Sequence, residues 1–266
     1  MSFKAFESVT RLFQNVSGIR LGEHKQALVS GRLQKLALEA GESDIDAYVA
    51  RLVGGQAPAA EMTRVIDRLT TNETYFFREP QHFNHLADRL RAAPTPSAIA
   101  PLAVWSAASS SGEEAYSCAM LMSDILGAEY WQVVGTDLST AMVDNARRAL
   151  YPMDRARLVP PDYLRRFCLK GHGEHEGHLL VAKAVRERVR FLSANLMQKL
   201  PELPMFDVIF LRNVLIYFDN EAKSQIVRRV LARLKPDGVL YTGHAESLSG
   251  LNLPVRTLAS AVHGHA

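Results

Sequence analysis

The segment 206–246 constrains the fold more than any other part of the chain, because it reads as a strand, a helix and a second strand in succession. Val208–Leu211 is apolar, branched and too short for a helix, as expected of a buried strand. The following helix is predicted from apolar residues at helical spacing, which are Ile226, Val227, Val230, Leu231 and Leu234. Pro236–Gly238 then predicts a turn before a further strand over Val239–Thr242.

The two strands of such a unit run parallel with a right-handed crossover, and ligands of parallel sheets bind beyond the carboxyl ends of the strands. Arg212 and Asn213 fall at such an end. Leu102–Ser106 and Trp131–Thr136 predict two more strands, and Asp137 directly follows the second of them. An acid in this position binds ribose hydroxyls in nucleotide-binding α/β folds, whereas the alternative interpretation is a cap on the next helix.

The chain divides into three parts by composition. Residues 1–70 carry apolar side chains at helical spacing and predict a small all-helical domain. Residues 71–101 predict a linker helix that ends in a Pro/Ala/Ser-rich stretch. Residues 102–266 predict an α/β domain, in which glycines and alternating residues suggest a small β-hairpin excursion at about 168–190.

Overall composition favours an ordinary soluble protein. The chain has 266 residues, of which 47% are hydrophobic and 22% charged, and its net charge is +3. No apolar run is long enough to span a membrane, and no dense Lys/Arg tract suggests nucleic-acid binding. The absence of heptads favours a monomer, and the default location is the cytoplasm.

Histidines in the excursion raise the question of a metal site. His172, His175 and His178 lie close together in the sequence. No cysteine accompanies them, and no defined strand or helix would fix their geometry. We therefore expect no metal there.

The stretch 70–80, TTNETYFFREP, places polar groups among aromatic ones. Asn72 and Thr74 precede, and Arg78 follows, a run of three aromatic residues that begins at Tyr75. Apolar walls with a few placed hydrogen bonds are typical of a small-molecule pocket. A capped helix start with its aromatic side chains in the core explains the same pattern.

Basic residues Lys25, Arg32 and Lys35 fall within one broad stripe of the second predicted helix. A solvated face is the simpler interpretation. The alternative is a docking surface for an acidic partner.

Four segments in this order resemble one family, the chemotaxis receptor protein-glutamate methyltransferases of the CheR family. They are LTTNETYFFREPQHF at 69–83, VWSAASSSGEEAYSCA at 104–119, VVGTDLSTAMVDNAR at 133–147 and FLRNVLIYFDNEAKSQIVRRVLARLKPDGVLYTGHAES at 210–247. The resemblance implies a Rossmann-like methyltransferase domain with a small inserted β-subdomain, preceded by an N-terminal helical domain. It also implies S-adenosylmethionine as methyl donor, S-adenosylhomocysteine as product, and a receptor glutamate side chain as acceptor.

The resemblance further implies the site residues. The family's cofactor-binding positions fall here on Asn72, Thr74, Arg78, Glu114, Asp137, Asn195, Leu196, Arg212 and Asn213. Arg78 and Tyr217 are the expected catalytic residues, the first orienting a carboxylate and the second lining the path of the methyl group. No acid–base pair is expected, because a glutamate with a pKa near 4.3 is already ionised at neutral pH.

The implied partner is the cytoplasmic domain of a chemoreceptor, so the resemblance implies a cytoplasmic protein recruited to membrane receptor arrays. Arg32 and Lys35 match part of the family's basic docking helix. Gly171, Gly173 and Gly177 match a hairpin that grips a C-terminal receptor peptide in some members. The tail is shorter, or more divergent, than the closing strands that the resemblance implies. The rival function is a non-catalytic cofactor-binding interaction module of a signalling array.

Overall fold

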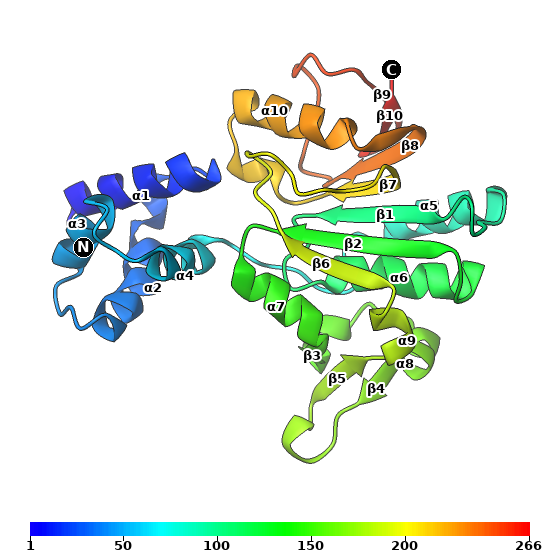
Figure 1. Ribbon diagram of the computed structural model, residues 1–266, viewed down its shortest axis with the longest axis horizontal. Helices are drawn as coiled ribbons and strands as arrows, with labels where there is room; N and C mark the ends of the chain where they lie inside the picture. Colours follow the sequence, from blue (N-terminus) through cyan, green and yellow to red (C-terminus); the bar gives the residue numbers. More distant parts are fainter.

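A computed structural model describes the chain over residues 1–266 and shows a helical domain beside an α/β domain (Figure 1). The helical domain contains α1 (Phe3–Ser17), η1 (Glu23–Lys25), α2 (Gln26–Glu39), α3 (Ile45–Val53) and α4 (Ala59–Leu69). Its core is separate from those of the α/β domain and includes Val9, Leu33 and Tyr48, all of them fully buried. The N-terminal all-helical domain predicted from the sequence is therefore present.

A seven-stranded sheet forms the centre of the α/β domain, with the order β6-β2-β1-β7-β8-β10-β9. The strands are β1 (Leu102–Ala107), β2 (Trp131–Asp137), β6 (Val189–Ser193), β7 (Phe206–Leu211), β8 (Leu234–Thr242), β9 (Val255–Ala259) and β10 (Val262–His265). The first five in spatial order are parallel, and the last two pair antiparallel. The carboxyl ends of the five parallel strands face the helical domain (Figure 1).

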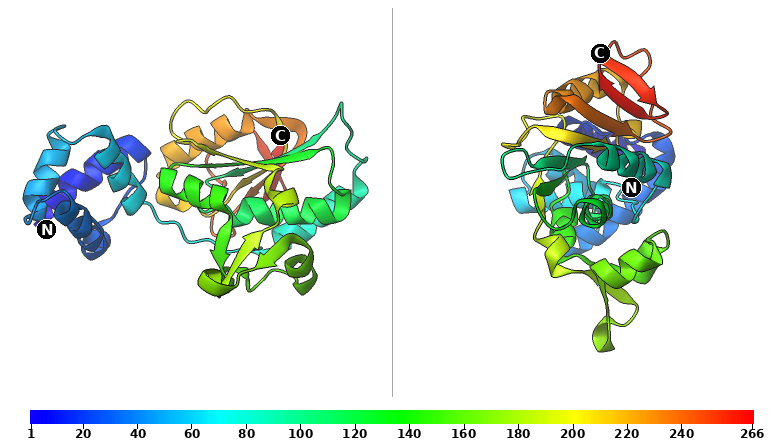
Figure 2. Two further views of the ribbon diagram at one scale, coloured as in Figure 1. Left: turned by 60° about the horizontal axis from the view of Figure 1, so that its bottom comes forward. Right: turned by 90° about the vertical axis from the view of Figure 1, so that its right-hand side faces the viewer.

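Helices cover both faces of this sheet (Figures 1 and 2). They are α5 (Pro80–Ala92), α6 (Glu113–Leu126), α7 (Thr140–Arg148) and α10 (Asn220–Leu231). Adjacent strand residues point to opposite faces: Val104 joins the core beneath α5, α6 and α7, whereas Trp105 joins the core beneath α10. Burial on both faces explains why the strands read as continuous apolar runs rather than as alternating ones.

The small sheet is larger than the sequence predicted. It contains β3 (Leu150–Pro152), β4 (Cys168–Lys170) and β5 (His178–Val181) in the order β3-β5-β4, and it projects from the body of the domain (Figure 1). α8 (Pro161–Phe167) precedes β4. The expected span of about 168–190 includes β4 and β5, whereas β3 precedes it and β6 of the main sheet begins at Val189. A three-residue strand such as β3 carries too few residues for an alternation signal.

Two details of the C-terminal third also differ from the prediction. Leu234 begins β8 rather than ending α10, and Pro236–Gly238 lies inside that strand at a register shift. The tail, for which weak periodicity predicted no strand, forms β9 and β10 at the edge of the sheet. β9 is mostly exposed, so it lacks the apolar pattern from which a strand is predicted.

Direct contacts join the two domains beyond the ends of β2 and β7. Asp67 at the end of α4 accepts a hydrogen bond from the Thr140 hydroxyl at 3.1 Å. The backbone N–H of Arg20 donates to the Tyr217 carbonyl at 3.1 Å. These bonds place the helical domain against the carboxyl edge of the sheet. No helix of the chain is both long and apolar enough to span a lipid bilayer.

Candidate functional site

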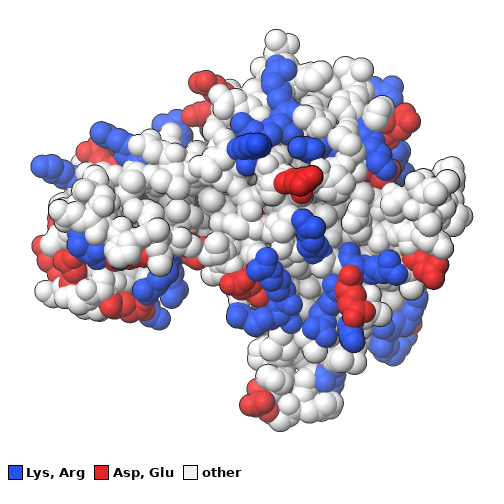
Figure 3. All heavy atoms as spheres, in the orientation of Figure 1, with Lys and Arg blue, Asp and Glu red and all other residues white.

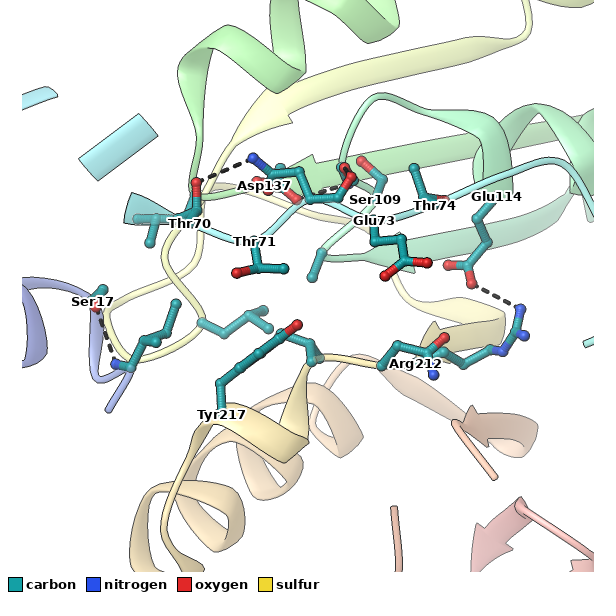
Figure 4. Close-up of a pocket in the computed structure, with 18 of the residues that line it drawn as sticks. Ser17, Thr70, Thr71, Glu73, Thr74, Ser109, Glu114, Asp137, Arg212 and Tyr217 are labelled. Carbon is teal, nitrogen blue, oxygen red and sulfur yellow. Dashed lines mark hydrogen bonds and ion pairs between the residues drawn. The ribbon is translucent and has the colours of Figure 1, made fainter. Parts of the chain in front are cut away.

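A pocket lies at the carboxyl edge of the sheet, between the strand ends and the helical domain (Figure 4). All of the residues expected to bind the cofactor line it, and so does Tyr217. They are Asn72, Thr74, Arg78, Glu114, Asp137, Asn195, Leu196, Arg212 and Asn213. The fold therefore brings together residues that are spread over more than half of the chain.

Asp137 is the last residue of β2 and lines one side of the pocket. Its Oδ2 accepts a hydrogen bond from the Ser110 N–H at 2.8 Å, and its Oδ1 accepts one from the Ser139 N–H at 2.9 Å. Burial raises the pKa of the Asp137 carboxyl to about 6, although these hydrogen bonds oppose the shift. The N-cap of α7 is Ser139, whose hydroxyl accepts a hydrogen bond from the Met142 N–H. The Asp137 carboxylate therefore does not serve as the helix cap. Both oxygens keep acceptor capacity for ligand hydroxyls.

Glu114 and Arg212 form an ion pair at the edge of the pocket away from Ser17 (Figure 4). Arg212 Nη1 lies 3.0 Å from Glu114 Oε2, and the Ser106 hydroxyl donates to Glu114 Oε1 at 2.7 Å. Burial raises the pKa of the Glu114 carboxyl, and the Arg212 charge opposes that shift. Arg212 also donates to the Arg78 carbonyl at 2.5 Å. Arg212 thus fixes the positions of two other predicted site residues.

Asn195 has a structural contact that the sequence did not reveal. Its Nδ2 donates to the Val16 carbonyl at 2.7 Å, and its Oδ1 accepts from the Met197 N–H at 2.9 Å. Both ends of the side-chain amide are therefore occupied within the chain. Leu196 beside it is buried and presents an apolar wall to the pocket.

Tyr217 lies across the cavity from Asp137 (Figure 4), and Arg78 also lines the pocket. Arg78 lies in the loop before α5, donates to the Glu73 carbonyl at 2.8 Å, and stacks its guanidinium over the Tyr75 ring at 5.7 Å. Tyr217 belongs to the short helix η4 (Leu215–Tyr217) and has Lys25 Nζ 5.4 Å from its ring centre. Burial raises the pKa of the Tyr217 hydroxyl, so this group stays a hydrogen-bond donor at neutral pH.

Glu246 supports the loop that carries this part of the pocket. No role was predicted for it from the sequence. Its buried carboxylate accepts hydrogen bonds from the N–H groups of Asn213 at 2.8 Å, Leu215 at 2.6 Å and Gly243 at 2.6 Å. A carboxylate with several backbone donors holds the loop after β7 in place. Its position shortly after the end of β8 was the one available signal.

The helical domain also supplies part of the pocket wall. Ser17, Ile19 and Leu21, which follow or end α1, line the cavity. Gly18 between them has a φ of 77°, and a Cβ there would lie 2.5 Å from Met197. The turn after α1 therefore passes close to the loop after β6, which no local sequence pattern could show.

Arg32 and Lys35, the residues predicted to dock a partner, lie on α2. Arg32 Nη1 donates to the carbonyls of Leu69 and Thr70, both at 3.1 Å, so its guanidinium holds the segment that leads into the pocket. Lys35 is exposed. The two side chains thus have different surroundings.

The three predicted hairpin glycines lie between β4 and β5, at the tip of the small sheet. A Cβ on Gly171 would lie 2.0 Å from the carbonyl oxygen of His175, so only glycine fits there. Gly173 and Gly177 have φ values of 58° and 77°, which L side chains rarely adopt. The hairpin therefore depends on glycine at each of these positions, and it does not line the pocket.

A parallel sheet with an acid at the end of its second strand, and a pocket at the strand ends, defines an α/β protein that binds a nucleoside-containing ligand. Carboxylates at Asp137 and Glu114 suit a ligand with hydroxyls and a cationic group. Residues 72–263 match the family described as "CheR methyltransferase, SAM binding domain", and residues 4–70 match "CheR methyltransferase, all-alpha domain". The protein is a methyltransferase that binds S-adenosylmethionine.

Similar proteins place the chain more closely. It is 38% identical to a chemotaxis protein methyltransferase of Salmonella typhimurium over 92% of this chain and 84% of the relative. It is also 38% identical to one of Escherichia coli, over 92% of this chain and 85% of the relative. A chemotaxis protein methyltransferase 2 of Pseudomonas aeruginosa is 33% identical over 98% of this chain and 92% of the relative. The chain belongs to the CheR family of chemotaxis methyltransferases.

Proposed function

We propose that this protein transfers a methyl group from S-adenosylmethionine to glutamate side chains of a chemoreceptor, which forms glutamate methyl esters during sensory adaptation. The observation that carries the proposal is the set of polar groups that line one pocket. Asp137 contributes two acceptor oxygens to it, and Arg78 contributes a cationic donor. These groups suit a ligand with hydroxyls together with an anionic acceptor.

The residues of the chain divide the work between binding and orientation. We assign Asp137 to the ribose hydroxyls, Glu114 and Asn72 to polar groups of the cofactor, and Asn195 with Leu196 to the adenine. Because the side-chain amide of Asn195 is occupied within the chain, we assign its contact to the backbone. The bound cofactor supplies an activated methyl group.

Arg78 and Tyr217 act on the acceptor side of the pocket. Arg78 orients a carboxylate, while the hydroxyl and ring of Tyr217 line the approach to the methyl group. An ionised glutamate needs no general base, since its pKa is far below neutral pH. Positioning and exclusion of water are then the remaining contributions, worth up to roughly 7–11 kcal/mol in ideal cases.

Partner recognition is proposed for two surfaces. The hairpin with Gly171, Gly173 and Gly177 would bind the C-terminal peptide of a receptor, and Lys35 with Arg32 would face the acidic receptor surface. Arg32 has this role only through the part of its guanidinium that does not hold the carbonyls of Leu69 and Thr70. We propose that the enzyme acts as a monomer in the cytoplasm and is recruited to receptor arrays.

Incubation with methyl-radiolabelled S-adenosylmethionine and a receptor cytoplasmic fragment tests the proposal. We expect label on the receptor that mild alkali releases as methanol, because carboxyl esters hydrolyse whereas methylated amines do not. Alkali-stable label would contradict glutamate as the acceptor. Binding of S-adenosylhomocysteine without any transfer would favour the rival function, a non-catalytic interaction module.

A further inference from the structure

Three side chains with metal-binding groups meet behind the pocket, and none of them lines it. Glu79 immediately precedes α5, His82 lies in the first turn of α5, and His244 follows β8. One donor atom of each lies within 4.8 Å of the other two. More than 160 residues separate the first two from the third along the chain, so the fold alone assembles this cluster.

The polar atoms of this cluster are poorly satisfied by the protein itself. His82 is 1% exposed, and neither of its ring nitrogens has a hydrogen-bond partner in the chain. Buried polar groups without partners are uncommon and costly, at about 1–3 kcal/mol each. Glu79 also has a φ of 57°, an unfavourable value for a residue other than glycine. Such strain persists where the surrounding structure requires the side chain in one place.

The distances suit a single ion. Zn²⁺ bonds nitrogen at about 2.0–2.1 Å, so neighbouring ligand atoms of a tetrahedral site lie roughly 3.3 Å apart. His82 Nδ1 lies 3.4 Å from Glu79 Oε2, and His244 Nε2 lies 3.9 Å from the same oxygen. The His244 ring stacks on the His82 ring with 4.7 Å between ring centres, and its side chain is 41% exposed, which leaves the site accessible from solvent.

Neighbouring groups are compatible with a bound cation. Glu79 is held from outside the cluster by Arg212 Nη2 at 3.0 Å and by Asn213 Nδ2 at 3.2 Å, as ligating carboxylates commonly are. A carboxylate has about four acceptor positions, so these bonds leave capacity for a metal. The positive charge of Arg212 is offset by its second carboxylate partner, Glu114.

We propose that Glu79, His82 and His244 bind a divalent transition-metal ion of the Zn²⁺ type. Two imidazoles and one carboxylate form a common three-ligand set for zinc, with water in the fourth position. The ion would tie the start of α5 to the loop after β8. These segments carry Arg78 and Glu246, so the metal would brace the end of the pocket where the acceptor binds.

Titration of Zn²⁺ into chelator-treated, tag-free full-length protein tests the site. The background is the variant His172→Asn/His175→Asn/His178→Asn, because that exposed loop could bind zinc on its own. We expect one ion per chain in this background, and a loss of affinity of at least about tenfold for His244→Ala. His85→Asn is the matched control, since His85 lies on the same helix but bonds to the Tyr241 hydroxyl at 2.8 Å.

A second variant and a spectroscopic measurement complete the test. His82→Gln should also lose the ion, and Co²⁺ should give the visible absorption of a four-coordinate site that His244→Ala abolishes. His244 is exposed, so its variant reports on binding even if the buried change at His82 prevents folding. Zinc binding that disappears with the loop substitutions, or that His244→Ala leaves unchanged, would overturn the proposal.

Discussion

Two sides of the pocket are built in different ways. On one side, Asp137 terminates a central strand, is buried, and has each carboxylate oxygen fixed by a backbone N–H. Arg78 and Tyr217, on the other side, come from a loop and a single helical turn and are only half-buried. The first side is rigid because the main sheet supports it, whereas the second depends on contacts between neighbouring loops.

This difference matches the two ligands that the site must accommodate. A cofactor of fixed structure is bound best by preorganised groups, since their ordering costs no free energy on binding. The acceptor is a protein side chain that must enter and leave. The side of the pocket with Arg78 and Tyr217 therefore has to remain open. If this division holds, substitutions on the two sides should affect cofactor binding and acceptor methylation separately.

The largest effect is expected for Asp137→Ala. The change removes both acceptor oxygens and leaves the N–H groups of Ser110 and Ser139 without their partner. We expect the affinity for S-adenosylhomocysteine to fall by about 100-fold or more, because hydrogen bonds to a charged group contribute about 1.5–3 kcal/mol each. Calorimetric titration measures this loss. Asp144→Ala, an exposed acid on α7, should leave the affinity unchanged, and an unaltered affinity for Asp137→Ala would remove the ribose role.

Arg78→Ala should affect acceptor methylation more than cofactor binding. We expect turnover with a receptor fragment to fall by roughly 10- to 100-fold, because an oriented carboxylate would lose its cationic partner. The affinity for S-adenosylhomocysteine should change much less. Arg91→Ala, an exposed arginine on α5, is the control for loss of a positive charge. If both quantities fell equally, Arg78 would serve the cofactor rather than the acceptor.

The pH dependence of cofactor binding sharpens the same comparison. The folded-state pKa of Asp137 is about 6, above its ordinary value near 3.8, so the carboxyl gains a proton as the pH falls through 6. A protonated carboxyl offers less to ribose hydroxyls, and the affinity should therefore fall by up to about tenfold per pH unit below 6. Asp137→Asn should bind weakly at every pH and lose this slope. A slope that persists in Asp137→Asn would assign the titration to another group.

The residues on the rigid side of the pocket could be predicted from the sequence. Buried strands such as β7 carry an unbroken apolar run, and Asp137 follows such a run directly, so both could be predicted. The sequence could not show that Asn195 bonds to Val16, or that Glu79 meets His244. These contacts join segments that are far apart in the chain. The local sequence pattern of each segment predicts its secondary structure but does not indicate which other segment it contacts.

Short or exposed elements were also beyond prediction. β3 has three residues and β9 is mostly exposed, so neither carries a periodic pattern. Leu234 continues the apolar spacing of α10, yet it pairs with Phe206 as the first residue of β8. Tertiary pairing overrides helical periodicity there, since the residue is buried in either arrangement.

Gly171→Ala should give the smallest effect on the enzyme, and the most selective one. The added Cβ would lie 2.0 Å from the His175 carbonyl oxygen, so the hairpin between β4 and β5 must shift. We expect binding of a receptor C-terminal peptide to weaken by several-fold to about tenfold, as removal of a few hydrogen bonds would do. The hairpin lies outside the pocket, so the affinity for S-adenosylhomocysteine should stay the same.

Gly31→Ala is the matched control for this glycine. Gly31 lies within α2, and a Cβ there meets nothing within 4 Å, so alanine should fit and favour the helix. Peptide binding by Gly31→Ala should equal that of the unaltered protein. If Gly171→Ala bound the peptide normally, the receptor tether would have to bind elsewhere. If it weakened S-adenosylhomocysteine binding as well, the small sheet and the pocket would be coupled, and the division between cofactor and partner sites would fail.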